Sequence, residues 1–139
     1  MSARLEFGQN FLEITNFRYF SEDAVGGSPY NTLFDLRVQS CDGKFAGVGD
    51  CEDDIKHIGW FADELQMMYE LKADAVKYRD AFGNGAEIEF TFSRTGHITV
   101  SGKVINFVHS MEFEFEADQT ALPPFINGLN KMLKEQGYE

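Results

Sequence analysis

The sequence predicts an α+β fold: an antiparallel meander of about eight strands, in two runs of four, with two amphipathic helices packed on one face in the order ββββαββββα. Short runs of alternating apolar and polar residues indicate the strands, and two segments with apolar steps of three and four residues indicate the helices. With 139 residues, 43% of them hydrophobic and 14 of them phenylalanine, the chain can build one core. We therefore expect residues 1–139 to form a single domain.

The first four strands are predicted from local alternation and from the turn residues between them. They are expected at residues 5–8, 11–20, 33–39 and 44–50. Phe34, Leu36 and Val38 share one face of the third strand, which is therefore the inward face. In the second strand the apolar phase changes halfway, and a β-bulge near Thr15 and Asn16 would reconcile its two halves.

The two cysteines, Cys41 and Cys51, are predicted to be free thiols. Asp42 and Gly43 indicate a tight turn, which would pair Cys41 with Lys44 and leave Cys51 roughly 20 Å or more along the hairpin. That separation is too great for a disulfide. Two free thiols, together with a beginning that lacks the apolar stretch of a secretory signal, lead us to expect a cytoplasmic protein without a membrane span.

The remaining elements follow from a change of period. Ile55, Ile58, Ala62, Leu65 and Tyr69 form the stripe of a first helix, and Glu52, Asp53 and Asp54 precede it, where carboxylates can accept from free helix amides. Further strands are expected at residues 74–80, 87–93, 97–107 and 111–117. A second helix follows, capped by Asp118 or Thr120, with Pro123 and Pro124 in its opening turn and Gly137 at its exit.

The charge balance limits the kinds of partner. Twelve Lys and Arg against 23 Asp and Glu give a net charge of −11, so nucleic acid and anionic membranes are poor partners. Two interpretations stay open: the acidity keeps the domain soluble and implies no partner, or it attracts a cationic one.

Alternation places five glutamates on one outward face of the second run of strands. They are Glu87, Glu89, Glu112, Glu114 and Glu116. If the strands form a meander, the strand at 97–107 lies between the two glutamate strands and offers His97, Thr99, Ser101 and Lys103 on the same face. The face is then a solvated sheet with cross-strand pairs to Lys77, Arg79 and Lys103, a metal or glycosidase site, or a docking surface for a basic protein.

No catalytic motif accompanies these residues. His57, His97 and His109 lack metal-site spacing, and the glycines match neither a phosphate-binding loop nor a dinucleotide fingerprint. We therefore expect no enzyme, no cofactor and no metal. Partner-binding candidates are the five glutamates, Asp53 and Asp54 at the helix start, and Trp60, which falls off the main helix stripe and could anchor an interface, including a homodimer.

The chain resembles the WapI-type immunity proteins, small bacterial proteins encoded beside polymorphic or contact-dependent toxins. The similarity extends over nearly the whole chain and rests on Asn10-Phe11-Leu12-Glu13-Ile14, on Asn31, Leu33 and Phe45, on Phe61, Leu65 and Tyr69-Glu70-Leu71, on Gly96-His97-Ile98 with Val100 and Gly102, and on Phe113-Glu114-Phe115-Glu116-Ala117-Asp118-Gln119-Thr120 with Leu122 and Phe125-Ile126. Ala121 and Pro124 depart from it, since the family tends to carry an aromatic and an acidic residue there.

The resemblance implies an inhibitor of a cognate toxin, without enzymatic activity, and supplies no set of toxin-contacting residues. Combined with the acidic face, it predicts a basic toxin such as a nuclease as the partner. The alternatives are a self-associating structural or scaffold protein and a small ligand-binding or hydrolytic domain with a pocket between helix and sheet.

Overall fold

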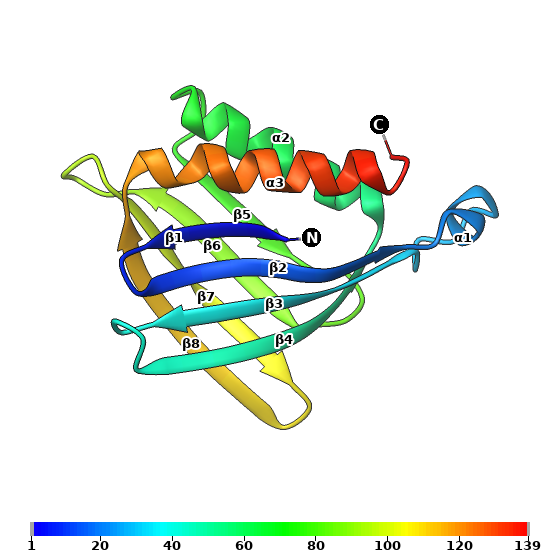
Figure 1. Cartoon of the computed structure of the whole chain (residues 1–139), viewed down its shortest axis with the longest axis horizontal. Coiled ribbons are helices and arrows are strands. Elements are labelled where there is room, and N and C mark those ends of the chain that lie inside the picture. Colours follow the sequence, from blue (N-terminus) through cyan, green and yellow to red (C-terminus); the bar gives the residue numbers. More distant parts are fainter. Residues whose placement is uncertain (1, 139) are drawn as a thin grey trace.

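The computed structural model describes residues 2–138 as two four-stranded antiparallel sheets with two long helices. The first sheet consists of β1 (Ala3–Phe7), β2 (Asn10–Tyr19), β3 (Thr32–Ser40) and β4 (Phe45–Asp53). The second consists of β5 (Ala75–Arg79), β6 (Ala86–Phe92), β7 (Ile98–Asn106) and β8 (His109–Ala117). Helix α2 (Ile55–Tyr69) joins the sheets and α3 (Leu122–Glu135) ends the chain, which confirms the predicted order (Figure 1).

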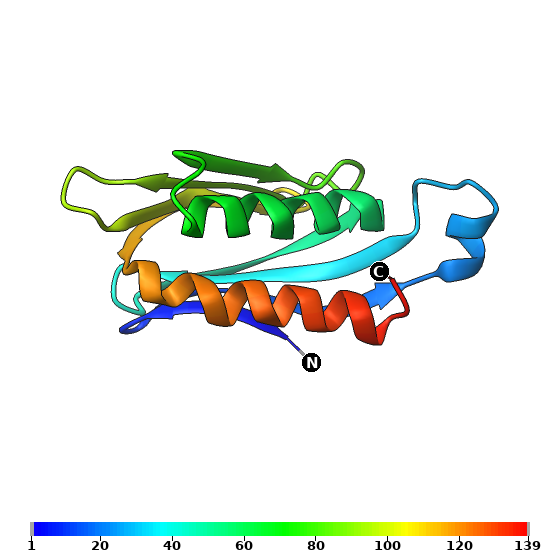
Figure 2. The ribbon, with the colours of Figure 1, turned by 90° about the horizontal axis from the view of Figure 1, so that it is seen from above.

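The two sheets face each other, and the helices close one end of the space between them. Strand β4 contacts β7, while α3 contacts β1 and α2 contacts β5 (Figure 1). Seen from above, α2 and α3 lie side by side, one beside each sheet (Figure 2). Each sheet is an uninterrupted meander, so its edge strands are the first and last of its four.

One continuous core fills the space between the sheets and the helices. Its largest fully buried side chains include Phe34, Phe90 and Phe125, one from each sheet and one from α3. Phe61 of α2 joins them, with ring centroids 5.9 Å from Phe90 and 6.2 Å from Phe125. Aromatic pairs at these distances add to the stabilisation that burial of their area provides.

Several local predictions are confirmed. The pairing of β2 with β3 changes register between Thr15 and Arg18, which places the bulge at the predicted phase change. Cys51 pairs with Phe34 across the β3–β4 hairpin, and both cysteines are free thiols, Cys41 exposed and Cys51 buried.

The structure also departs from the prediction at element ends. The connection between β2 and β3, to which no element was assigned, contains the short helix α1 (Ser21–Val25), and the 3-10 turn η1 (Gln119–Ala121) precedes α3. His97 lies in the turn before β7 and not in the strand. Strand β4 continues to Asp53, three residues beyond the predicted end at Asp50, with consequences described below.

Close approach of β4 to the second sheet depends on two glycines. A Cβ atom at Gly49 would lie 2.0 Å from the carbonyl oxygen of Gly85, and one at Gly85 would lie 2.0 Å from that of Asp50. Only glycine fits such backbone contacts. This junction brings the end of β4 beside β5 and the turn that follows it.

The helices have moderate lengths. Helix α2 has 15 residues and α3 has 14. Within residues 2–138, neither helix has the length and apolarity that a bilayer crossing requires.

Candidate functional site

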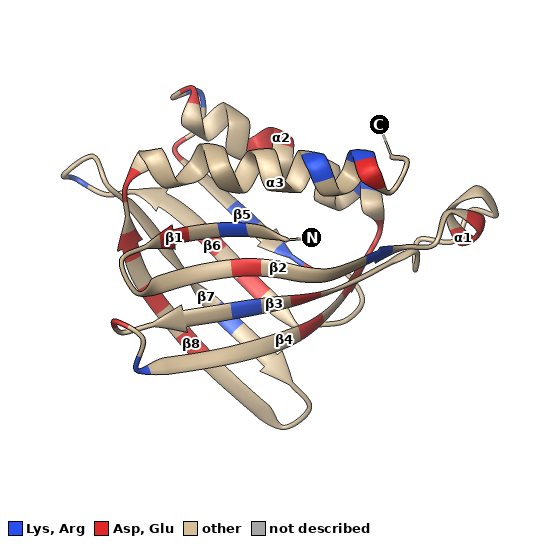
Figure 3. Ribbon diagram, viewed as in Figure 1, with Lys and Arg blue, Asp and Glu red and all other residues tan. Residues whose placement is uncertain are grey.

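The outward face of the second sheet carries the five predicted glutamates, and we call it the acidic face. Strand β7 lies between β6 and β8, so that Lys103 is opposite both Glu87 and Glu112, and Ser101 is opposite both Glu89 and Glu114. Glu116 completes the row on β8, opposite Thr99. The predicted arrangement, two columns of carboxylates flanking a polar strand, is therefore present (Figure 3).

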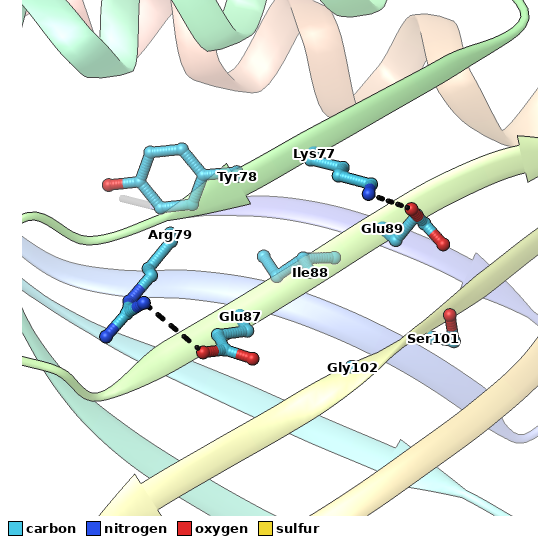
Figure 4. Close-up of a pocket in the computed structure, with 8 residues that line it drawn as sticks. All are labelled: Lys77, Tyr78, Arg79, Glu87, Ile88, Glu89, Ser101 and Gly102. Carbon is cyan, nitrogen blue, oxygen red and sulfur yellow. Dashed lines mark ion pairs between the residues drawn. The ribbon is translucent and has the colours of Figure 1, made fainter.

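The two columns differ in their neutralisation. On β6, the carboxylate of Glu89 is 3.2 Å from the Lys77 ammonium and that of Glu87 is 3.7 Å from the Arg79 guanidinium (Figure 4). Both basic residues come from the neighbouring edge strand, β5. These are the cross-strand pairs expected for a solvated sheet, and they balance the charge of the β6 column.

The column on β8 has no such partners. Glu112, Glu114 and Glu116 are all exposed. Within residues 2–138, no Lys, Arg or His nitrogen lies within 4.0 Å of their carboxylates. Lys103 is opposite Glu112 in register, yet its ammonium makes no ion pair at that distance. Because β8 is an edge strand, its carboxylates have a neighbouring strand on one side only. Within residues 2–138, the carboxylates of the β8 column are therefore the ones on this face without an ion-pair contact.

The acidic face is hollowed along its middle. One hollow of about 480 Å³ lies between β5, β6 and β7, and a second of about 710 Å³ lies between β6, β7 and β8. They share Glu87, Ser101 and Gly102, so they adjoin each other across the sheet. Figure 4 shows the residues that line the first of them. Two adjoining, shallow hollows with charged walls suit contact with a protruding part of a macromolecule better than enclosure of a small ligand.

Asp53 was predicted to face a partner, and this prediction is wrong. Its side chain is fully buried. Oδ2 accepts a 2.5 Å hydrogen bond from the Tyr78 hydroxyl, and Oδ1 lies 2.6 Å from Nδ1 of His57 and 2.7 Å from the Asp54 amide. The cause is the longer strand: because β4 continues to Asp53, strand alternation turns this residue to the inward face, together with Cys51.

Asp54, at the start of α2, and Trp60, on α2, lie apart from the acidic face. Asp54 caps the helix, accepting from the Lys56 amide at 3.1 Å and from the Asn31 side chain at 3.2 Å, as the carboxylates before the helix were expected to do. Trp60 is 58% exposed, packs beside the His57 ring at 5.3 Å, and lines a hollow of about 350 Å³ between α2 and α3. Their part in binding remains a prediction.

Two buried carboxylates, those of Asp53 and Asp80, connect β4 to the second sheet through hydrogen bonds. Neither role was predicted from the sequence. Asp53 joins β4 to Tyr78 on β5 and to His57 on α2. Burial and the charge of Asp53 raise the pKa of Tyr78 well above its ordinary value. The available sequence signal was the four-residue spacing of Asp53 and His57 across the predicted start of a helix, where side chains so spaced can meet.

Asp80 fixes the turn after β5. Its carboxylate accepts hydrogen bonds from the amides of Glu52 (3.0 Å), Gly85 (2.9 Å) and Ala86 (3.0 Å). The side chain is only 1% exposed, and burial raises its pKa despite these donors. Within residues 2–138, no three His, Cys, Asp or Glu side chains gather as metal ligands would, and both buried carboxylates are occupied by internal donors.

Comparison with known proteins extends to the fold alone. No family model matches the chain, and no curated protein matches it in sequence. Among solved structures, that of Trypanosoma brucei MRP1/MRP2 is similar, with a TM-score of 0.51 and 12% identity over 99% of this chain and 85% of the other. At that identity the likeness concerns the arrangement of strands and helices and carries no activity with it.

Proposed function

We propose that this protein is a non-enzymatic, immunity-type binding protein that neutralises a cognate bacterial toxin. The partner is a basic protein such as a nuclease, and the acidic face meets the groove in which that toxin would hold the phosphates of its substrate. The observation that carries the proposal is the β8 column: three exposed carboxylates in one row without a basic neighbour in ion-pair contact within residues 2–138. The resemblance to WapI-type immunity proteins supports the same class.

The geometry of the β8 column favours a cationic surface over a single ion. Successive carboxylates stand two residues apart, about 6.8 Å along an antiparallel strand. A row with that spacing can face several Lys or Arg side chains at once and so imitate the charge of a phosphate backbone. With a net charge of −11 behind it, such a row would also steer a basic protein toward the face and accelerate association at low ionic strength.

The glutamates of the acidic face have unequal roles in this proposal. Glu87 and Glu89 are held by Arg79 and Lys77, so a partner's cations would have to compete with these residues. Glu112, Glu114 and Glu116 offer their oxygens without such competition. We therefore assign the direct contacts with the partner to the glutamates of β8, and to those of β6 only a contribution to the electrostatic potential of the face.

The proposal is tested by reversing charge on β8 and measuring affinity for the basic protein that co-purifies with this chain in its source cell. Glu112→Lys with Glu114→Lys should weaken binding by about tenfold or more and flatten its dependence on salt. The matched control is Glu22→Lys with Asp23→Lys on α1, two exposed residues without ion pairs within residues 2–138. It changes the net charge equally, so it reports the long-range field alone.

Comparing the two variants separates direct contact with the partner from the effect of the protein's net charge. If the β8 variant loses affinity and the α1 variant keeps most of it, the carboxylates act in the interface. Equal losses would mean that only net charge matters, and unchanged affinity in both variants would remove the acidic face from the account.

A further inference from the structure

The hairpin between β7 and β8 ends in two apolar side chains that are almost fully exposed. Asn106 pairs with His109, which leaves Phe107 and Val108 as a two-residue connection. Each of them is 92% exposed. The hairpin tip projects beyond the rest of both sheets, at the end of the molecule opposite the helices (Figure 1).

The backbone at this tip is unfavourable for the residue it carries. Phe107 has φ of 57°, in the left-handed region, where a residue with a side chain costs about 1–2 kcal/mol relative to the right-handed one. Two-residue hairpins normally place glycine, asparagine or aspartate at such positions. Asparagine here would be both less strained and more soluble, so neither folding nor solubility accounts for the phenylalanine. A contact made outside the chain would account for it.

The surroundings of the tip lack charge, and we call residues 45–48 and 104–111 the apolar corner. These 12 residues include no Asp, Glu, Lys or Arg, although charged residues make up 25% of the chain and about three would be expected. Phe45 and Val48 of β4 are 60% and 40% exposed. A hollow of about 180 Å³ lies between β4 and the base of the hairpin, lined by Val48, Val104 and Met111 among others. In Figure 3 the lower part of the hairpin carries neither acidic nor basic residues.

We infer that the apolar corner is the contact surface for a second copy of this chain. In a two-fold dimer the tip of each copy enters the hollow of the other, so one patch serves as both donor and acceptor. A hollow of about 180 Å³ is smaller than the roughly 300–1,000 Å³ of small-molecule sites and suits a single side chain. The apolar corner is also a place where two copies that each carry −11 can meet without setting carboxylates against carboxylates, because it contains no Asp or Glu.

The size of the surface sets the strength of the dimer. Phe107 and Val108 of each copy, both 92% exposed, would supply most of the buried surface, and Val48, 40% exposed beside the hollow, would add a part. The total lies below the roughly 1,200 Å² at the lower end of specific interfaces. We therefore expect weak, reversible association that becomes visible only at high protein concentration. This inference goes beyond the proposed function and does not depend on it, since the glutamates of β8 take no part in the dimer.

The test is sedimentation of the purified protein over a concentration series from low micromolar to several hundred micromolar. The weight-average mass should rise from 15.8 kDa toward twice that value. Phe107→Asn should weaken the dimer by about 30-fold or more, as expected for an interface anchor. Because asparagine tolerates a positive φ, this variant should stay folded and, in dilute solution, unfold at a temperature no lower than that of the wild type.

Trp60→Ser is the matched control, because it removes another exposed aromatic residue, on α2. It should leave the dimer intact, and concentration-dependent amide shifts in the wild type should fall within residues 45–48 and 104–111. Raised salt should strengthen the dimer by screening the like charges, whereas it should weaken the proposed toxin contact. A monomeric wild type over the whole range, or a dimer lost in Trp60→Ser and kept in Phe107→Asn, would overturn the inference.

Discussion

Tyr78→Phe tests the buried hydrogen bond between Tyr78 and Asp53, the residue that was predicted to contact a partner and is instead buried. The substitution removes the hydroxyl that donates to Oδ2 of Asp53 at 2.5 Å and keeps the ring, which stacks on Phe61 with centroids 4.6 Å apart. Asp53 is fully buried, so that oxygen has no access to water as a substitute donor. Hydrogen bonds to charged groups contribute about 1.5–3 kcal/mol. We therefore expect the free energy of unfolding to fall by about 2 kcal/mol.

Urea denaturation followed by the fluorescence of Trp60 measures this change, and thermal unfolding should show a decrease in Tm of about 6–10 °C for a chain of this length. Tyr30→Phe is the control. Tyr30 is 56% exposed, and within residues 2–138 its hydroxyl makes no hydrogen bond, so its removal should change stability by less than about 0.5 kcal/mol. A change that small for Tyr78→Phe would mean that the buried hydroxyl contributes no more to stability than a solvated one.

Three further outcomes follow from individual residues. Leu71, with φ of 62° and 72% exposure, occupies the position after α2 that Gly137, with φ of 85°, occupies after α3; Leu71→Gly should stabilise the protein by about 1 kcal/mol in thermal unfolding, and Gly137→Leu should do the reverse. Burial raises the pKa of Asp80 above its ordinary value of 3.8 in the folded state. The folded state therefore holds this proton more tightly than the unfolded state, and protonation of Asp80 favours folding. The stability of the wild type relative to Asp80→Asn should therefore decline as pH rises from 3.8 through the raised value, and urea titrations showing an increase would contradict this sign. Cys41 should react with a thiol reagent in the native state, and Cys51, whose pKa burial raises, only after unfolding.

Much of the fold was predictable because its signals are local. Alternation in β3 assigned Phe34, Leu36 and Val38 to the core, and all three are buried. The turn at Asp42 and Gly43 fixed the register of the β3–β4 hairpin. Strict alternation likewise predicted the common face of the glutamates, since strand side chains point to opposite faces with a period of two.

Other features could not be predicted, because they depend on where a strand ends and on which strand lies beside it. The end of β4 decided that Asp53 is buried, and three residues of additional strand reversed its predicted role. Cross-strand pairs to Lys77, Arg79 and Lys103 were one of the three interpretations of the acidic face; the pairs to Lys77 and Arg79 are present on β6, while the difference between the two columns was not predicted. The positive φ of Phe107 has no sequence signal, because phenylalanine is not a residue from which such a backbone would be predicted.

Whether the β8 column binds a basic toxin can be measured by toxin neutralisation with matched variants. The protein would be purified from its source cell with whatever remains bound, and the bound protein identified by mass spectrometry and assayed for toxicity with and without this chain. We expect one basic protein at near-equal stoichiometry, silenced by the wild type and by the α1 charge reversal, and released by reversal of Glu112 and Glu114. Recovery of this chain alone, or silencing that survives the β8 reversal, would rule out the proposed contact.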